Sequence, residues 1–159
     1  MIEDFKKKLK SMILNRSVAI VCVGTDLLSG DCLGPLVGQF LVEMNVNAFV
    51  YGTLSTPINA LNVDRANEFV LSRHRERLII AVDSAVGKNV GQIAVKNGSI
   101  APGAADGKVL KPIGDISITA TTSSALPSEK DFSLVPLGLI YMLARRITEG
   151  ICFAIGAAE

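Results

Sequence analysis

The chain has 159 residues, of which 49% are hydrophobic and 19% charged, and it carries a formal net charge of +1 at pH 7. This length favours one domain covering residues 1–159, and the balanced charge gives no basis for binding nucleic acid or an anionic membrane surface. The longest uncharged apolar run, residues 132–144, contains Pro136 and Gly138. It is shorter than the roughly 20 residues that a membrane-spanning helix needs, so we expect no membrane partner.

Short apolar runs predict the strands of a parallel sheet, and apolar residues spaced three and four apart predict helices. In chain order the pattern predicts a helix at 2–14, a strand at 18–23, a helix at 34–44, a strand at 48–51, a helix at 58–75, a strand at 78–82, an edge or antiparallel strand at 92–96, a strand at 116–120, a helix at 132–149 and an edge strand at 151–155. Turn residues predict long loops at 97–114 and 121–131. The alternation of strands and helices indicates the α/β class, as a three-layer α/β/α sandwich around a mostly parallel mixed sheet of about five strands.

Two aspartates follow predicted strands. Asp31 lies in the loop after strand 18–23, just before Gly34-Pro35 opens a helix, and Asp83 directly follows strand 78–82. Ligands of open α/β sheets bind at the carboxyl ends of the strands. If these two strands are adjacent and parallel, Asp31 and Asp83 meet in one crevice.

Two carboxylates in one crevice repel each other, so they share a proton and one apparent pKa rises. Such a pair can act as general base and general acid on a water molecule. Asp31 is expected to be the ionised partner because it lies near the positive end of a helix dipole. We predict Asp31 and Asp83 as catalytic residues, and a substrate-binding surface formed by Gly24, Thr25, Asp26 and Asp115. Alternatively, each aspartate only caps a helix or a loop.

Other chemistry finds little support in the sequence. Neither nucleotide-binding fingerprint is present, and no cluster of His and Cys residues suggests a metal, so we expect no cofactor and no metal. The alternatives are a weak site for a hard cation formed by Asp31, Asp83 and Asp115 and an anion site formed by the backbone of the loop at 24–34. His74, the only histidine, is expected to interact with the dipole at the end of helix 58–75 or to lie exposed.

The three cysteines, Cys22, Cys32 and Cys152, form no C-x-x-C pair, which favours a reducing cytoplasm over a disulfide framework. Cys32 adjoins Asp31 at a predicted helix start, where a thiolate is stabilised, but no nearby histidine would take its proton. The apolar face of helix 132–149 suits core packing or a homodimer.

The motifs of the acidic loop, VGTD at 23–26 and GDCLGPLVG at 30–38, resemble the signature of the YyaC-like sporulation proteins, a family placed near the spore germination protease. Further similar segments follow in the same order, namely VYGTL at 50–54, AVD at 81–83, PG at 102–103 and KPIGDI at 111–116. The resemblance implies the fold of hydrogenase maturation proteases, with one antiparallel strand. In those relatives acidic functional residues follow the first strand and end the third, which corresponds here to Asp31 and Asp83.

This sequence departs from the hydrogenase maturation proteases at two places. No histidine follows strand 116–120, and SAVG at 84–87 stands where ACLG is expected. The resemblance implies a sporulation-associated, peptidase-like protein that acts on a peptide or protein substrate in the cytoplasm of the forespore or mother cell. The alternative is a non-catalytic protein of sporulation that uses the same crevice for a peptide, an anion or a partner.

Overall fold

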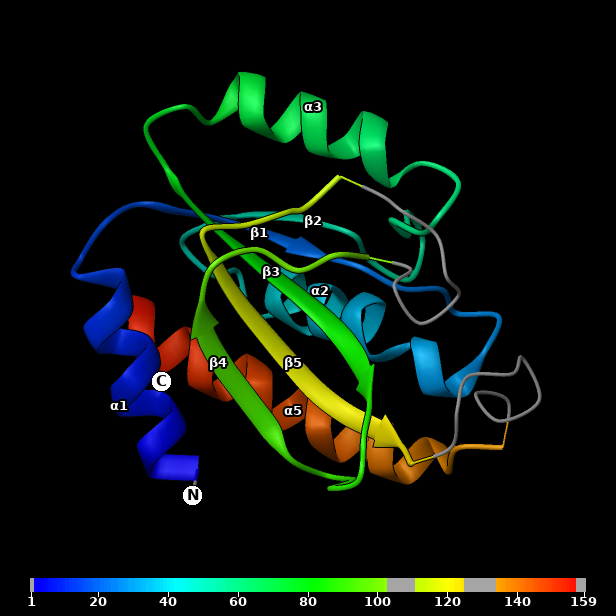
Figure 1. Ribbon diagram of the computed structural model, residues 1–159. Helices are drawn as coiled ribbons and strands as arrows, with labels where there is room; N and C mark the ends of the chain where they lie inside the picture. The colour runs from blue at the N-terminus through cyan, green and yellow to red at the C-terminus, as the bar shows by residue number, and fades with distance from the viewer. Residues whose placement is uncertain (1, 103–110, 125–133, 157–159) are drawn as a thin grey trace.

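The computed structural model describes residues 2–102, 111–124 and 134–156. Its sheet has five strands in the order β2-β1-β3-β5-β4 (Figure 1). β1, β2, β3 and β5 run parallel, and β4 pairs antiparallel with β5 at one edge. The strand bounds are Val18–Cys22 for β1, Phe49–Tyr51 for β2, Leu78–Val86 for β3, Ile93–Asn97 for β4 and Ile116–Ser123 for β5. The predicted fold class is confirmed.

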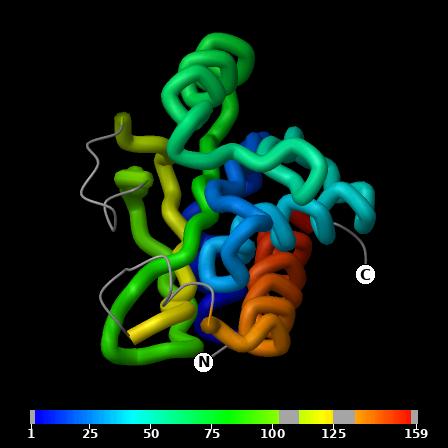
Figure 2. Tube along the Cα trace, turned by 90° about the vertical axis from the view of Figure 1, so that its right-hand side faces the viewer, coloured from blue at the N-terminus to red at the C-terminus, as the bar shows by residue number. Residues whose placement is uncertain are grey.

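Helices cover both faces of the sheet, as Figures 1 and 2 show. α3 (Val63–Arg73) lies on one face, and α1 (Ile2–Ile13), α2 (Leu33–Glu43) and α5 (Leu137–Ile155) lie on the other. Side chains of β1 alternate between two apolar clusters, with Ile20 in the large cluster under α1, α2 and α5 and Val21 in the smaller one under α3. β1 is therefore buried on both faces, as its continuous apolar run predicts. No helix within the three described ranges is long and apolar enough to cross a membrane.

The predicted helix at 58–75 begins five residues later, at Val63. Ile58 instead forms a parallel bridge with Val23, which extends the sheet beyond β2. Asn59 and Asn62 then make a turn in which the Asn59 N–H donates to the Asn62 side chain at 2.9 Å. These side-chain bonds compete with helix formation, and they explain the late start.

The predicted strand at 151–155 is wrong, because α5 continues through this segment to Ile155. Ile147, Ile151 and Ala154 are all buried, so the apolar stripe keeps its helical spacing past the predicted end. The helix starts at Leu137, directly after Pro136. The first two residues of the predicted helix, 132 and 133, lie outside the described residues.

β3 and β5 are longer than predicted. β3 runs past Asp83, where a loop was expected, and pairs with β5 as far as Val86 and Ser123. Of the predicted loop at 97–114, residues 103–110 lie outside the described residues, while Ile100 and Ile113 form an antiparallel bridge. Most of the predicted loop at 121–131 also lies outside them.

Gly34 allows α2 to pack directly on the end of β1. A Cβ atom at this position would collide with the backbone of Val23, so no other residue fits without moving the helix. Pro35 follows in the first turn of α2, where a helix has no use for its missing N–H. The sequence Gly34-Pro35 therefore fixes where α2 starts relative to the strand.

We predict that Gly34→Ala lowers the free energy of unfolding by about 1–3 kcal/mol, because the added methyl group overpacks the contact with Val23. Gly138→Ala is the matched control, since open space surrounds that position in α5, and it should leave stability unchanged or slightly raised. Urea unfolding of both variants measures the difference. Equal effects would contradict the close packing of α2 on β1.

Candidate functional site

The site lies at a step in the sheet where β1 ends and β3 continues. Cys22, the last residue of β1, lies opposite Val82, and the Val23 N–H donates to the Val82 carbonyl at 2.8 Å. Asp83 is therefore the first residue of β3 beyond the end of β1. The loop that follows β1 occupies the space above this step.

The loop at 24–31 returns on itself and brings Asp31 back to the end of β1. The Thr25 N–H donates to the Asp31 carbonyl at 3.0 Å, and the Asp31 N–H donates to the Leu28 carbonyl at 3.0 Å. Gly24 has a φ of +146° and lies against the Asp31 backbone, where a Cβ atom would collide with the carbonyl oxygen. Only glycine tolerates both conditions.

Ser84 contacts both aspartates. Its N–H donates to Oδ1 of Asp83 at 2.8 Å, and its hydroxyl donates to Oδ1 of Asp31 at 3.1 Å. The structure thus brings together the two residues that we predicted to meet, with a serine between them that the prediction missed. The sequence offered one indication of this role, because Ser84 directly follows Asp83.

Asp83 keeps its proton to unusually high pH. Burial of the carboxyl raises its pKa well above the ordinary value of 3.8, and the nearby charge of Asp31 raises it further. The Ser84 N–H acts in the opposite direction, because it stabilises the charged form. A carboxyl group that keeps its proton in this way can serve as a general acid.

Two hydroxyl groups fasten the 3₁₀ helix η1 (Ser29–Asp31) to its neighbours. The Ser29 hydroxyl donates to the Val135 carbonyl at 2.7 Å, and the Thr122 hydroxyl donates to the Gly30 carbonyl at 3.0 Å. Sequence analysis missed both, because no local pattern marks a bond between residues so far apart. Beside these bonds lies a hollow of about 420 Å³ lined by Val90, Thr122, Ser123, Ser124, Leu134, Val135, Pro136 and Leu139.

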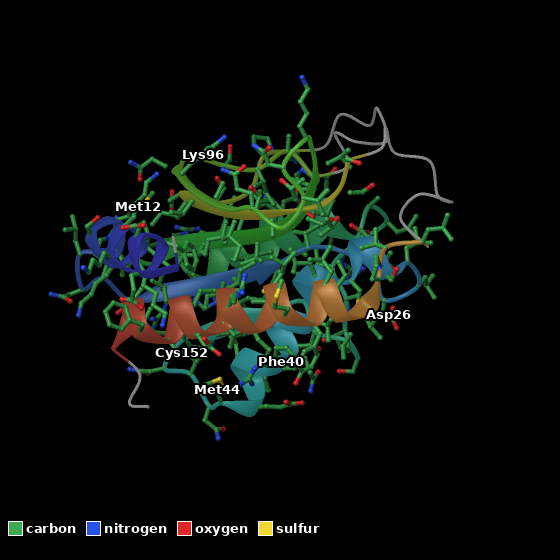
Figure 3. All side chains as sticks on the ribbon, turned by 90° about the horizontal axis from the view of Figure 1, so that it is seen from below. Met12, Asp26, Phe40, Met44, Lys96 and Cys152 are labelled. Atoms are coloured by element: carbon green, nitrogen blue, oxygen red, sulfur yellow. The ribbon has the colours of Figure 1, made fainter. Side chains whose placement is uncertain are left out.

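Asp26 lies exposed on the same loop, at the end of the molecule towards which β1 points (Figure 3). Its charge acts on the neighbouring Cys32, a buried free thiol. Burial raises the pKa of that thiol, and the charges of Asp26 and Asp31 raise it further. The expectation that the helix start stabilises a Cys32 thiolate is therefore wrong.

Asp115 does not lie at this site. It precedes β5, which runs parallel to β3. It therefore lies at the amino ends of these strands, whereas Asp83 lies towards their carboxyl ends. There its carboxylate accepts a hydrogen bond of 2.8 Å from the N–H of Ile79, near the start of β3. Asp115 fastens two strands at their amino ends, which corrects its assignment to the substrate-binding surface.

His74, predicted within the last turn of a helix at 58–75, directly follows α3 instead, and it is not exposed: only 6% of its surface is accessible. Its Nε2 lies 2.6 Å from the Tyr51 hydroxyl, and its ring contacts Phe49. Burial lowers the pKa of His74, and the charges of Arg77 and Arg73 lower it further. The imidazole therefore favours its neutral form and serves packing at the edge of the sheet.

Among the residues that the structure describes, no group of three or more His, Cys, Asp and Glu side chains is placed to hold a metal ion.

The layers and the strand order give this chain the fold of a hydrogenase maturation protease. Its structure is similar to that of the [NiFe] hydrogenase maturation protease HycI from Thermococcus kodakarensis KOD1, with a TM-score of 0.59 over 89% of this chain and 93% of that chain. The two sequences are 18% identical, so this likeness concerns the fold.

The chain belongs to the family described as "Protein of unknown function (DUF1256)", whose model matches residues 1–150. It is 36% identical to the "Uncharacterized protein YyaC" of Bacillus subtilis (strain 168) over 141 residues, which cover 86% of this chain and 68% of that protein. The predicted resemblance to YyaC-like proteins is confirmed.

The raised pKa of Asp83 predicts a stability effect with a definite sign. Because its folded pKa exceeds the ordinary value of 3.8, Asp83 stabilises the fold at low pH, and this contribution is lost as pH rises through the folded pKa. Asp83→Asn should therefore gain stability relative to the wild-type protein between pH 4 and pH 7. Urea unfolding at both pH values measures it, and a stability difference independent of pH would contradict the raised pKa.

Proposed function

We propose that this protein is a peptidase in which Asp31 and Asp83 act together on one water molecule. The observation that carries the proposal is the meeting of two aspartates around Ser84, with the pKa of one of them raised by burial and by the charge of the other. Perturbed pairs of this kind are typical of acid–base catalysis. The fold of a hydrogenase maturation protease supports a peptide substrate by analogy.

In this mechanism the Asp31 carboxylate takes a proton from the water, and the water oxygen attacks the peptide carbonyl carbon. Asp83 donates its proton to the carbonyl oxygen, which gives a tetrahedral diol. When the diol collapses, Asp83 recovers a proton from one hydroxyl, and Asp31 gives its proton to the departing nitrogen. Both aspartates return to their starting states. Gly24, Thr25 and Asp26 form the mouth at which the substrate binds.

The second candidate function is non-catalytic binding of a peptide, an anion or a partner protein at the same crevice. The specific observation in its favour is the hollow beside η1, whose walls are formed by apolar side chains and hydroxyl-bearing residues. Such a lining suits the side chain of a bound peptide. Under either function, the resemblance to YyaC-like proteins is the basis for proposing a role in sporulation, in the cytoplasm of the forespore or mother cell.

We predict that the protein cleaves a component of an extract from sporulating cells, and that Asp31→Asn and Asp83→Asn each slow this cleavage by at least about 100-fold, the usual contribution of one acid–base group. Mass spectrometry of the products measures the rates. Asp115→Asn is the matched control, because this aspartate lies at the other end of the strands. This variant should cleave like the wild-type protein.

Unchanged turnover in Asp83→Asn would end the proposed mechanism. If the wild-type protein cleaves nothing but retains peptides that Val90→Asp, a change in the wall of the hollow, does not retain, the binding function replaces it.

The pH dependence of cleavage follows from the same pair. The general acid must be protonated, so the rate should fall as pH rises through the raised pKa of Asp83. A pH–rate profile measures this fall in the rate of cleavage. A rate that only increases with pH up to 9 would contradict the role of Asp83 as the acid.

A further inference from the structure

Ser84 reaches both carboxylates with different groups. Its backbone N–H donates a hydrogen bond of 2.8 Å to Asp83. Its side-chain hydroxyl donates one of 3.1 Å to Asp31, which lies 53 positions earlier in the sequence. We propose that Ser84 is a positioning residue whose hydroxyl holds the Asp31 carboxylate beside Asp83. The inference rests on the proposed function, because it concerns the separation of the same pair.

The place of Ser84 on β3 makes its hydroxyl a fixed anchor. Ser84 lies opposite Ala120 of β5 within the parallel ladder, so the neighbouring strand determines where its backbone lies. Asp31 is then held by a group on a rigid element, which positions a site more accurately than a loop does.

Two other bonds hold η1 through different atoms, the Ser29 hydroxyl and the Gly30 carbonyl. Ser29 and Thr122 fasten the helix through the carbonyls of Val135 and Gly30, whereas the Ser84 hydroxyl is directed at the carboxylate of Asp31 itself. The charges of Asp26 and Asp31 both act on the Cys32 thiol near the start of α2, whose pKa burial raises and these charges raise further. The Ser84 hydroxyl is therefore a neutral donor to a carboxylate that lies among acidic groups.

The position of Asp31 can be measured through the titration of Asp83, because the charge of Asp31 contributes to the raised pKa of Asp83. The experiment is a carboxyl ¹³C NMR titration of Asp83 in the wild-type protein, Asp31→Asn, Ser84→Ala and Ser84→Thr. Asp31→Asn removes the charge of Asp31 altogether, so it should lower the pKa of Asp83. The size of this fall measures the whole contribution of the Asp31 charge. Ser84→Ala removes only the hydroxyl and keeps the N–H that serves Asp83.

We expect Ser84→Ala to lower the pKa of Asp83 by at least half of the fall seen in Asp31→Asn, because the released carboxylate moves away from its like-charged neighbour. Ser84→Thr should restore the wild-type titration, since threonine keeps the hydroxyl. Ser84→Cys keeps a side chain of similar size with a weaker donor, and it gives a second measurement of the same fall. Ser72→Ala is the matched control: it removes an exposed hydroxyl on α3 that bonds only within its own helix, and it should change nothing.

The outcomes separate this inference from the proposed function. If Asp31→Asn lowers the pKa of Asp83 but Ser84→Ala and Ser84→Cys titrate like the wild-type protein, the positioning role is overturned and the aspartate pair stands. If Asp31→Asn itself leaves Asp83 unchanged, the two carboxyls do not interact, and the proposed pair fails together with its anchor. Where cleavage is measured, Ser84→Ala should lower kcat with little change in KM, and Ser84→Thr should restore it.

Discussion

Parallel pairing of β1 with β3 determines both the core and the candidate site. With Cys22 opposite Val82, alternate side chains of β1 enter the two apolar clusters on either side of the sheet. A shift of one residue would send each side chain to the wrong face, so burial of this strand fixes its register. The same register sets where β1 stops relative to Asp83, and the packing that stabilises the fold therefore creates the step at which Asp31 and Asp83 meet.

The step places Asp83 where its charge is disfavoured. Burial and the charge of Asp31 both oppose ionisation, so the surrounding apolar core must offset the cost of keeping this residue there. Local rules of folding are commonly violated at functional sites. The contrast with Asp115 is informative. Its carboxylate accepts a hydrogen bond from an N–H at the amino ends of the strands, and this contact explains Asp115 as a fold-stabilising residue.

The sequence predicted the central strands well because they are continuous apolar runs bounded by turn residues, although the same kind of run at 151–155 is helical. It failed where side chains from distant segments decide the outcome: the bridge of Ile58 to Val23 delays α3, and contacts with Tyr51 and Phe49 bury His74. The misplacement of Asp115 was avoidable. In a parallel sheet, a residue that precedes one strand and a residue that follows another lie at opposite ends of the strands. The position of Asp115 before β5 therefore already excluded a contact with Asp83.

Likeness to HycI concerns the fold, and a fold hosts many functions, so the chemistry has to be argued from the residues at the step. Here Asp83 and Ser84 share one strand and hold their relative positions, while Asp31 arrives on η1 from a separate part of the chain. The separation of the two carboxyls therefore depends on where η1 lies. Ser29 and Thr122 bond η1 to its neighbours, and Ser84 bonds the Asp31 carboxylate. Ser84 bonds both carboxyl groups, Asp83 through its backbone N–H and Asp31 through its hydroxyl, so one residue of β3 links the two side chains on which the proposed chemistry depends.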